Sequence, residues 1–390
     1  MGLFRRKTQN DEEIEKAVDK RMRRRTKVII IALVIVLAIG GVYLFQRFRT
    51  YSTYKVEETI PIKSGEGSKY VPFGKFVVKY SNNGIMYLDD EDVIWDEAYE
   101  MKTPIVDVCD DYLAVADKGT NDIYIYNEDG RKGKVTTNYP IIKIQVAKQG
   151  VTAAMSKNKR DNYIEVFDRK GKTLVSHKTL LNENGYPLNF AISDDGTKMA
   201  VSYVTVKAGT INSKVMFYNF AGAGQNEENK MVGSFDQYGE SVVPEIDFVT
   251  NNRVVAVGEN IISVYDMKSK PDLKDERKVE DDIQKVFLSS DYIGLIYKNS
   301  KGKMPYRLEA YSMGTRRVLN KDISMNFDNV SFAGKNILMY NNLNCQIISI
   351  HGVKKFDYIF KRPVSTILPW GGERSYLFMT NQAIQKVKLK

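Results

Sequence analysis

The apolar positions of this chain follow two patterns, one long and continuous and the other short and repeated. Residues 28–45 (VIIIALVIVLAIGGVYLF) are apolar throughout and carry no charge. With Gln46 the run reaches the length of an α-helix that crosses about 30 Å of hydrocarbon. After residue 70 the apolar residues come in short runs rich in β-branched and aromatic side chains, which is typical of strands. The pattern predicts one transmembrane helix followed by an all-β domain.

The strand-like runs recur in pairs up to the C-terminus. The later member of each pair ends in an apolar residue before a turn, as in IMYLD (85–89), IYIYN (123–127), IEVFD (164–168), VMFYN (215–219), ISVYD (262–266), LEAYS (308–312), IISIH (347–351) and IQKVKLK (384–390). The earlier members are FVVKY (76–80), YLAVAD (112–117), VTAAMS (151–156), MAVSYV (199–204), RVVAVG (253–258), YIGLIY (292–297), NILMY (336–340) and SYLFMT (375–380). Copies lie roughly 37 to 51 residues apart, close to the length of propeller blades.

Eight copies of this kind predict an all-β fold, an eight-bladed β-propeller preceded by a single transmembrane α-helix. Small sheets cannot bury both faces alone, and packing them around an axis solves that problem. Seven blades are the alternative, because residues 205–250 are hard to divide. The last copy ends at Lys390 without a fourth strand, and residues 54–62 (YKVEETIPI) are expected to supply it and close the ring.

The predicted domain organisation follows from these patterns. Its parts are a cytoplasmic basic tail (1–27), a transmembrane signal-anchor helix (28–46), a linker with a possible ring-closing strand (47–70) and an extracellular β-propeller (71–390). A cleaved signal peptide is the alternative for the apolar run. It is disfavoured because no A-x-A site follows the run and because the charged segment before it is long.

The charges that flank the apolar run orient the helix. The basic residues on its N-terminal side include Arg21, Arg23, Arg24, Arg25 and Lys27. The positive-inside rule places this side in the cytoplasm and the C-terminal domain outside a single-pass cell-membrane protein. The same residues are expected to lie against anionic membrane lipid.

Net charge and cysteine content exclude several classes of protein. The formal charge is +10, but residues 1–27 contribute +5 and residues 71–390 only about +3. This density is too low for a phosphate-binding face, so no nucleic-acid partner is expected. Cys109 and Cys345 are read as small buried side chains, with a disulfide as the alternative. No CxxC or Cys/His cluster predicts a metal site, and no cofactor is expected.

One repeat resembles a known class of propeller. The segment FAISDDGTKMAVS (190–202) is similar to the strand–turn–strand of WD-like and Tol-type propellers. As a whole, the anchor and the repeats resemble an uncharacterised family of membrane-anchored propeller proteins from Gram-positive bacteria, within the WD-like and quinoprotein-like superfamily. The resemblance implies fold and location, and it brings no catalytic motif.

Motifs for chemistry are scarce in the sequence. The segment SDDGT (193–197) fails the sialidase Asp-box pattern, and two tryptophans are too few for a quinoprotein docking motif. His177 is expected to be exposed and His351 to be a turn residue. Paired carboxylates at a propeller mouth remain the one route to an enzyme, an envelope glycan hydrolase.

Three long segments between strands, 206–213, 220–245 and 267–282, are better candidates for binding. The middle one contains Phe235 and Tyr238, aromatic residues of the kind that anchor interfaces. The sequence therefore predicts a non-catalytic, membrane-tethered extracytoplasmic propeller that is a protein- or envelope-binding scaffold. The alternatives are the glycan hydrolase and a transmembrane sensor.

Overall fold

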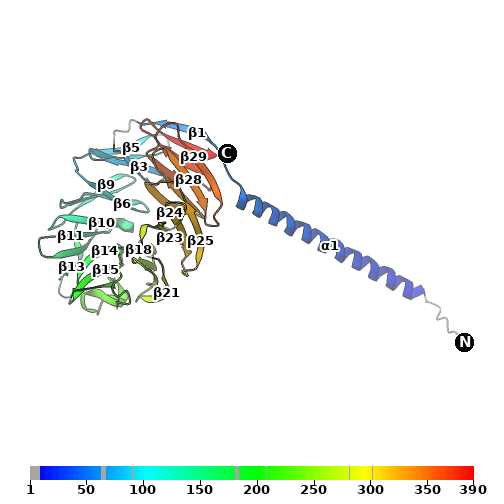
Figure 1. The fold of residues 1–390 in the computed structure, drawn as a ribbon, viewed down its shortest axis with the longest axis horizontal. Coiled ribbons are helices and arrows are strands. Elements are labelled where there is room, and N and C mark those ends of the chain that lie inside the picture. Colours follow the sequence, from blue (N-terminus) through cyan, green and yellow to red (C-terminus); the bar gives the residue numbers. More distant parts are fainter. Residues whose placement is uncertain are drawn as a thin grey trace. The chain divides into compact units, whose positions relative to one another are not determined.

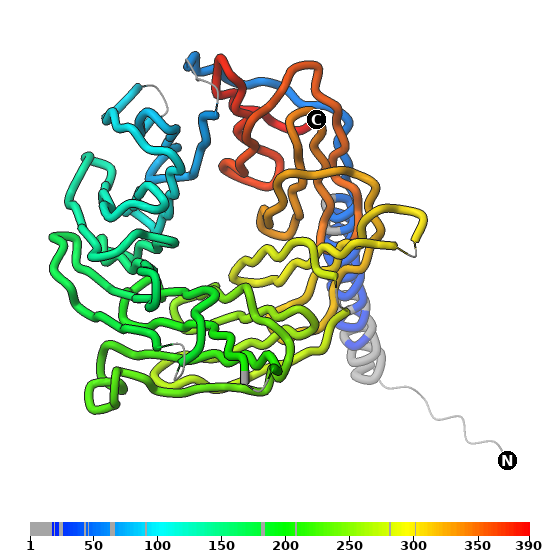
Figure 2. Tube along the Cα trace, turned by 60° about the vertical axis from the view of Figure 1, so that its left-hand side comes forward, coloured from blue at the N-terminus to red at the C-terminus, as the bar shows by residue number. Residues whose placement is uncertain are grey.

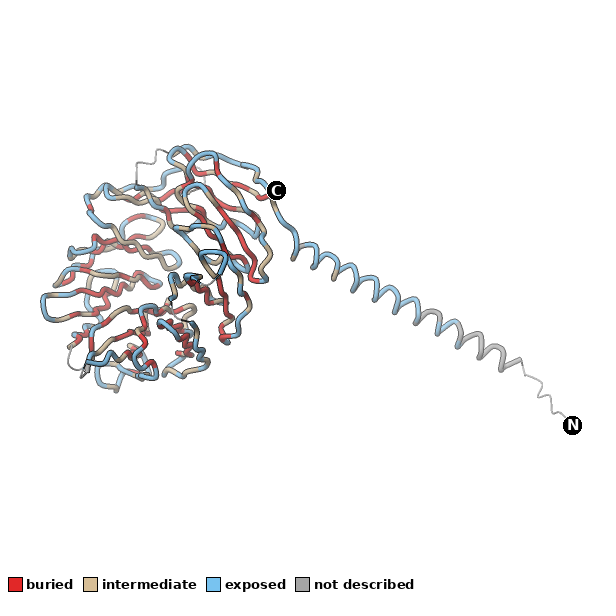
Figure 3. Tube along the Cα trace, in the orientation of Figure 1, coloured by how far each residue is buried: buried red, intermediate tan, exposed pale blue. Residues whose placement is uncertain are grey.

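The computed structural model describes residues 9–62, 67–89, 92–180, 184–207, 209–280, 282–300 and 302–390. The chain divides into two compact units, Met1–Tyr51 and Ser52–Lys390. The first contains one helix, α1 (Gln9–Phe48). Its segment Lys20–Val42 has a mean hydropathy of 2.3 and is long and apolar enough to cross a membrane. The described side chains between residues 26 and 37 are all exposed on the helix (Figure 3).

The second unit is an eight-bladed β-propeller, as predicted. Among the described residues, its strands form eight antiparallel sheets of four strands each (Figure 1). Blades 1 to 4 are β2–β5 (Lys69–Phe73, Phe76–Ser81, Gly84–Leu88, Val93–Ala98), β6–β9 (Pro104–Cys109, Tyr112–Asp117, Asp122–Asn127, Gly130–Thr136), β10–β13 (Ile141–Val146, Thr152–Lys157, Asn162–Phe167, Thr173–Thr179) and β14–β17 (Tyr186–Ile192, Lys198–Lys207, Thr210–Asn219, Met231–Phe235).

Blades 5 to 8 continue the order around the ring. They are β18–β21 (Glu245–Thr250, Arg253–Val257, Ile261–Asp266, Asp272–Lys278), β22–β25 (Ile283–Leu288, Tyr292–Lys298, Tyr306–Ser312, Arg317–Ile323), β26–β29 (Asn329–Ala333, Asn336–Tyr340, Asn344–Ser349, Lys354–Ile359) and β30–β32 (Thr366–Pro369, Ser375–Met379, Ala383–Leu389) with β1 (Tyr54–Pro61). Short 3₁₀ turns lie at η1 (Lys148–Gly150), η2 (Gly222–Gly224) and η3 (Glu228–Lys230).

Blade 8 is assembled from both ends of the propeller sequence. β1 pairs antiparallel with β32, in a register that runs from Tyr54 opposite Leu389 to Pro61 opposite Ala383. β1 therefore takes the place of the fourth strand that the sequence assigns to residues 54–62. Figure 2 shows β1, in blue, beside the red C-terminal strands. An ion pair of 2.8 Å between Lys386 Nζ and Glu58 Oε2 also spans the two strands.

The repeated sequence pattern produces the core. The second and third strands of each blade lie between two neighbouring sheets, so both of their faces are buried and their sequences are apolar runs. The aromatic residue near the end of the repeat fills the space between blades. Its instances at Tyr126, Tyr218 and Tyr265 are all at most 1% exposed. A hydrophobic cluster of this kind also joins blade 8 to blade 1, with Leu377 packed beside Phe76.

The strand order gives the propeller two distinct faces. Since the strands of a blade alternate in direction, the connections between blades and the turns between second and third strands lie on one face, which we call the connection face. The other turns lie on the opposite face. There Ser52 N and Thr53 N donate hydrogen bonds to the carbonyl of Lys390, so we call it the Ser52 face.

Two of the three long segments proved to be regular structure. Residues 206–213 form the tip of the β15–β16 hairpin, in which Val206 pairs with Ile211. Residues 267–282 contain β21, the outer strand of blade 5. His177, expected to be exposed, is 9% exposed, and its Nε2 lies 3.2 Å from the Tyr218 hydroxyl. That expectation was wrong because β13 packs His177 between blades, whereas His351 is an exposed turn residue as expected.

Candidate functional site

The first strands of neighbouring blades place charged and amide residues together in the interior of the ring. Asp107 lies on β6, Lys143 on β10, Asn189 on β14 and Asp247 on β18. We call these four residues the central cluster. Lys143 Nζ donates hydrogen bonds to Asn189 Oδ1 (2.5 Å) and to the carbonyl of Phe190 (2.8 Å). The ammonium also lies 5.1 Å from the centre of the Phe190 ring.

Hydrogen bonds through this cluster connect four consecutive blades. Asp107 Oδ2 accepts a 2.7 Å hydrogen bond from the backbone N–H of Val146, which joins blade 2 to blade 3. Lys143 joins blade 3 to blade 4 through its bonds to Asn189 and Phe190. Asn189 Nδ2 donates to the carbonyl of Pro244 at 2.9 Å, which reaches the start of blade 5. The cluster thus ties together half of the ring.

Burial shifts the proton affinities of all three charged members. It raises the pKa of Asp107 to about 6, although the Val146 N–H and the Lys143 ammonium act against the increase. Burial likewise raises the pKa of Asp247 to about 6, again opposed by Lys143. Burial lowers the pKa of Lys143, and Asp247 and Asp107 oppose that change. Lys143 therefore stabilises the charged form of each carboxylate and is stabilised by both, whereas Asp247 disfavours the charge on Asp107.

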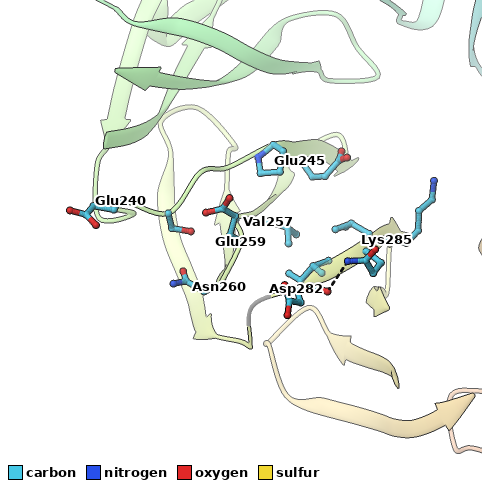
Figure 4. Close-up of a pocket in the computed structure, with 13 residues that line it drawn as sticks. Glu240, Glu245, Val257, Glu259, Asn260, Asp282 and Lys285 are labelled. Carbon is cyan, nitrogen blue, oxygen red and sulfur yellow. Dashed lines mark hydrogen bonds between the residues drawn. The ribbon is translucent and has the colours of Figure 1, made fainter. Parts of the chain in front are cut away.

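A cleft of about 760 Å³ opens between blades 5 and 6 on the connection face, and we call it the acidic cleft. Its wall includes the carboxylates Glu240, Glu245, Glu259 and Asp282, with Lys285 as the basic residue. These side chains, labelled in Figure 4, come from the segment before β18 and its first residue, from the β19–β20 turn, and from the residue before β22 and its start.

Glu245 connects the cleft to the central cluster. Burial raises the pKa of its carboxyl group, while Lys143 of the cluster and Lys285 of the cleft act to lower it. Glu259 Oε2 accepts a weak 3.4 Å hydrogen bond from the N–H of Val242, across the mouth of the cleft. Glu240, Glu259 and Asp282 form no ion pair with any residue that the structure describes. Their charges are available to a cationic group that enters the cleft.

The acidic cleft can bind a ligand through the negative charges of its carboxylates. Over the described part of the chain, no group of three His, Cys, Asp or Glu side chains is arranged to hold a metal ion. Both cysteines are free thiols: Cys345 is buried in blade 7 and Cys109 half-buried in blade 2.

Phe235 and Tyr238, predicted to be interface anchors, are packing residues of the core between blades 4 and 5. Tyr238 is 5% exposed, and its hydroxyl lies 2.5 Å from that of Tyr265. The Phe235 ring packs against Tyr265 and Phe217, with centroid distances of 4.8 and 5.8 Å. Tyr238 is therefore buried and Phe235, at the end of β17, is half-buried against the same core.

The basic residues expected to flank the membrane lie on α1. Arg21 and Lys27 are exposed on the helix, and the side chains of Arg23, Arg24 and Arg25 are outside the described set.

Sequence reasoning missed the central cluster because it followed the second and third strands of each copy. A signal was present in the first strands: PIVDVC, IIKIQV, YPLNFAI and EIDFVT each carry a charged or amide residue inside an apolar run. A polar residue at a corresponding place in successive repeats predicts a shared location near the ring axis.

Comparison with known proteins identifies a family and supports the fold. A family model described as "Family of unknown function (DUF5711)" matches residues 47–389. No curated protein matches the sequence.

Solved structures with the same fold are distant in sequence. BamB from Moraxella catarrhalis is 9% identical, with a TM-score of 0.57 over 86% of this chain and 100% of its own. Sqt1 from Saccharomyces cerevisiae is 11% identical, with a TM-score of 0.56 over 88% and 99%. Sqt1 from Chaetomium thermophilum, bound to the N-terminus of the ribosomal protein L10, is 9% identical, with a TM-score of 0.56 over 86% and 100%. At these identities the likeness establishes the propeller fold alone.

Proposed function

The chain belongs to the DUF5711 family of unknown function, and we propose that it is a membrane-tethered extracytoplasmic propeller that binds a protein partner through its acidic cleft. The single observation that carries the proposal is the set of four carboxylates in a cleft of about 760 Å³ on the connection face. The partner is a protein segment rich in Lys or Arg.

The tether rests on α1 and its flanking charges. The segment Lys20–Val42 is long and apolar enough to span a bilayer. Basic residues at its N-terminal end, including Arg21 and Lys27, favour a cytoplasmic tail, with residues 47–390 outside. The resemblance to membrane-anchored propellers of Gram-positive bacteria supports the same arrangement.

The binding mode rests on electrostatic complementarity. An incoming ammonium or guanidinium group would meet Glu240, Glu259 and Asp282, three carboxylates without ion-pair partners among the described residues. Pairs at such a rim contribute about 0.2–1 kcal/mol each and mainly set partner choice and association rate. A propeller of the same fold, Sqt1, holds the N-terminus of another protein in its structure, so the fold is suited to binding a chain segment.

Site-specific photo-crosslinking in intact cells tests the proposal. A photoreactive amino acid at Asn260, an exposed residue of the cleft wall, should give a discrete crosslinked protein. Charge reversal by Glu240→Lys and Glu259→Lys should abolish that crosslink. The matched control is Asp129→Lys with Asp291→Lys, which reverses two exposed carboxylates in turns of the Ser52 face. A crosslink that survives the cleft variant, or is lost equally in the control, would contradict the proposal.

The envelope glycan hydrolase remains a second candidate because Asp107 and Asp247 have pKa values of about 6, suited to proton transfer near neutral pH. It predicts cleavage of purified cell-wall glycan by the full chain and complete loss of activity on Asp247→Asn. Absence of any cleavage by the unmodified chain would remove this candidate.

A further inference from the structure

A second depression, about 690 Å³ in volume, lies between blades 7 and 8, beside the ring-closing strand β1. We call it the closure groove. Tyr54 and Thr59 of β1 contribute to its wall from blade 8, and Tyr358 of β29 from blade 7. The connection between these blades adds Lys361 and Arg362. The closure groove shares no lining residue with the acidic cleft.

The floor of the closure groove is aromatic. The rings of Tyr54 and Tyr358 meet edge to face, with centroids 5.1 Å apart and planes at 75°. Tyr54 makes a similar contact with Phe378, at 5.1 Å and 73°. Tyr54 and Tyr358 are half-buried, so a part of each ring is accessible from the groove. This floor can hold apolar side chains of an occupant.

The rim of the closure groove is basic. Lys361 and Arg362 are both exposed, and no Asp or Glu is among the residues that line the groove. The side-chain amides of Asn381 and Gln382 are exposed at the same rim. The charge is therefore opposite to that of the acidic cleft, and the complementary ligand is an anion.

We propose that the closure groove binds an extended acidic peptide segment whose apolar side chains contact the aromatic floor. A peptide fits better than an anionic glycan, because sugar rings stack on free aromatic faces. Here the rings are already packed against other aromatic side chains: Tyr358 stacks on Phe356, with centroids 5.6 Å apart and planes at 5°, and it meets Tyr54 edge to face. An extended peptide instead offers alternating side chains, apolar ones toward the floor and acidic ones toward Lys361 and Arg362.

A peptide bound in the closure groove also stabilises β1 in its place in the propeller. β1 is the fourth strand of blade 8 and contacts blade 7 through Tyr54 and Tyr358. A peptide that contacts the side chains of both Tyr54 and Tyr358 connects the closing strand β1 to blade 7. Opening of β1 then requires release of the peptide, so binding slows the local unfolding of residues 54–61.

The test uses the full chain in detergent and a fluorescent ten-residue peptide with Glu and Phe at alternating positions. Fluorescence anisotropy should detect binding, and a peptide with Gln in place of Glu should bind far more weakly. Lys361→Glu with Arg362→Glu should weaken binding by about tenfold or more, because two attractive charge contacts become repulsive. Hydrogen exchange should slow in β1 when the peptide is bound.

A matched control separates the groove from general surface charge. Lys335→Glu with Arg316→Glu makes the same change of charge in turns of the Ser52 face, and it should leave binding within about twofold. Equal weakening by both variants, or binding without slower exchange in residues 54–61, would overturn the proposal. Binding of polygalacturonate but not of the acidic peptide would overturn it in favour of an anionic glycan.

Discussion

Replacement of Asp247 by asparagine should make the propeller more stable at pH 8 relative to pH 5, although it removes from the central cluster a charge that Lys143 favours. Burial raises the pKa of Asp247 from 3.8 to about 6, so the folded protein holds this proton more tightly than the unfolded chain does. The stability associated with that proton is fully present below pH 3.8 and is lost as pH rises through about 6. Asparagine mimics the protonated side chain and cannot ionise.

The magnitude follows from the size of the shift. A shift of about two pKa units corresponds to about 3 kcal/mol in the free energy of unfolding, since each unit is worth about 1.4 kcal/mol. About half of this difference develops between pH 5 and pH 8, because ionisation in the unfolded chain is already complete by pH 5. Asp247→Asn should therefore gain about 1 kcal/mol relative to the unmodified protein between these two pH values.

Urea unfolding of the full chain in detergent at pH 5 and pH 8 measures this difference. Asp195→Asn is the matched control. Burial alone would raise the pKa of Asp195, but hydrogen bonds from Ser193, Thr197 and Asn251 hold it below its usual range. Its carboxyl group stays ionised from pH 5 to pH 8, so this variant should lose stability by the same amount at both. The reasoning is refuted if Asp247→Asn shows no pH dependence, or becomes less stable at pH 8 than at pH 5.

Three further predictions address the closure, the core and the anchor. Ile60→Asp should lower the free energy of unfolding of the propeller by about 2 kcal/mol in urea, because Ile60 packs into the cluster that joins blade 8 to blade 1. An unchanged urea midpoint would show that β1 is dispensable for closure. Tyr238→Phe should cost about 1 kcal/mol through the lost hydrogen bond to Tyr265, with partner crosslinking at the acidic cleft unchanged; loss of the crosslink would return Tyr238 to the binding surface. Leu37→Arg places a charge at the centre of the apolar run, and insertion of Arg into a bilayer costs about 3 kcal/mol. The variant should therefore move from the membrane to the soluble fraction on cell fractionation. Retention in the membrane would contradict a single-helix anchor.

Much of the fold could be predicted because its signals are local. The apolar run before residue 46 needs no partner to identify it as a membrane-length helix. The eight strand pairs repeat within contiguous stretches, and residues 54–62, a strand-like run before the first copy, were the natural candidate to complete the last blade. Each of these inferences depends on pattern within a few dozen residues.

Burial of single side chains was harder to predict. Phe235 and Tyr238 lie in a Gly- and Asn-rich stretch that has the composition of a surface loop. The burial of Tyr238 depends on the Tyr265 hydroxyl of the next blade, and Phe235 packs on the Tyr265 ring from β17, the outer strand of blade 4. His177 was misjudged for the same reason, because its partner Tyr218 lies in a different blade.

The sequence by itself determined the helix and the repeat, since the spacing of apolar residues encodes secondary structure and its repetition encodes a ring, whereas the choice of eight blades over seven needed the sheet topology. Only the tertiary structure decided which charged side chains lie close together. Asp107 and Asp247 are separated by more than three blade lengths of sequence, yet both act on Lys143. The closure groove likewise joins Tyr54, near the start of the propeller, to Tyr358, near its end. A ring brings the first strand of every blade to one axis and the last blade to the first, and these contacts have no counterpart in local sequence pattern.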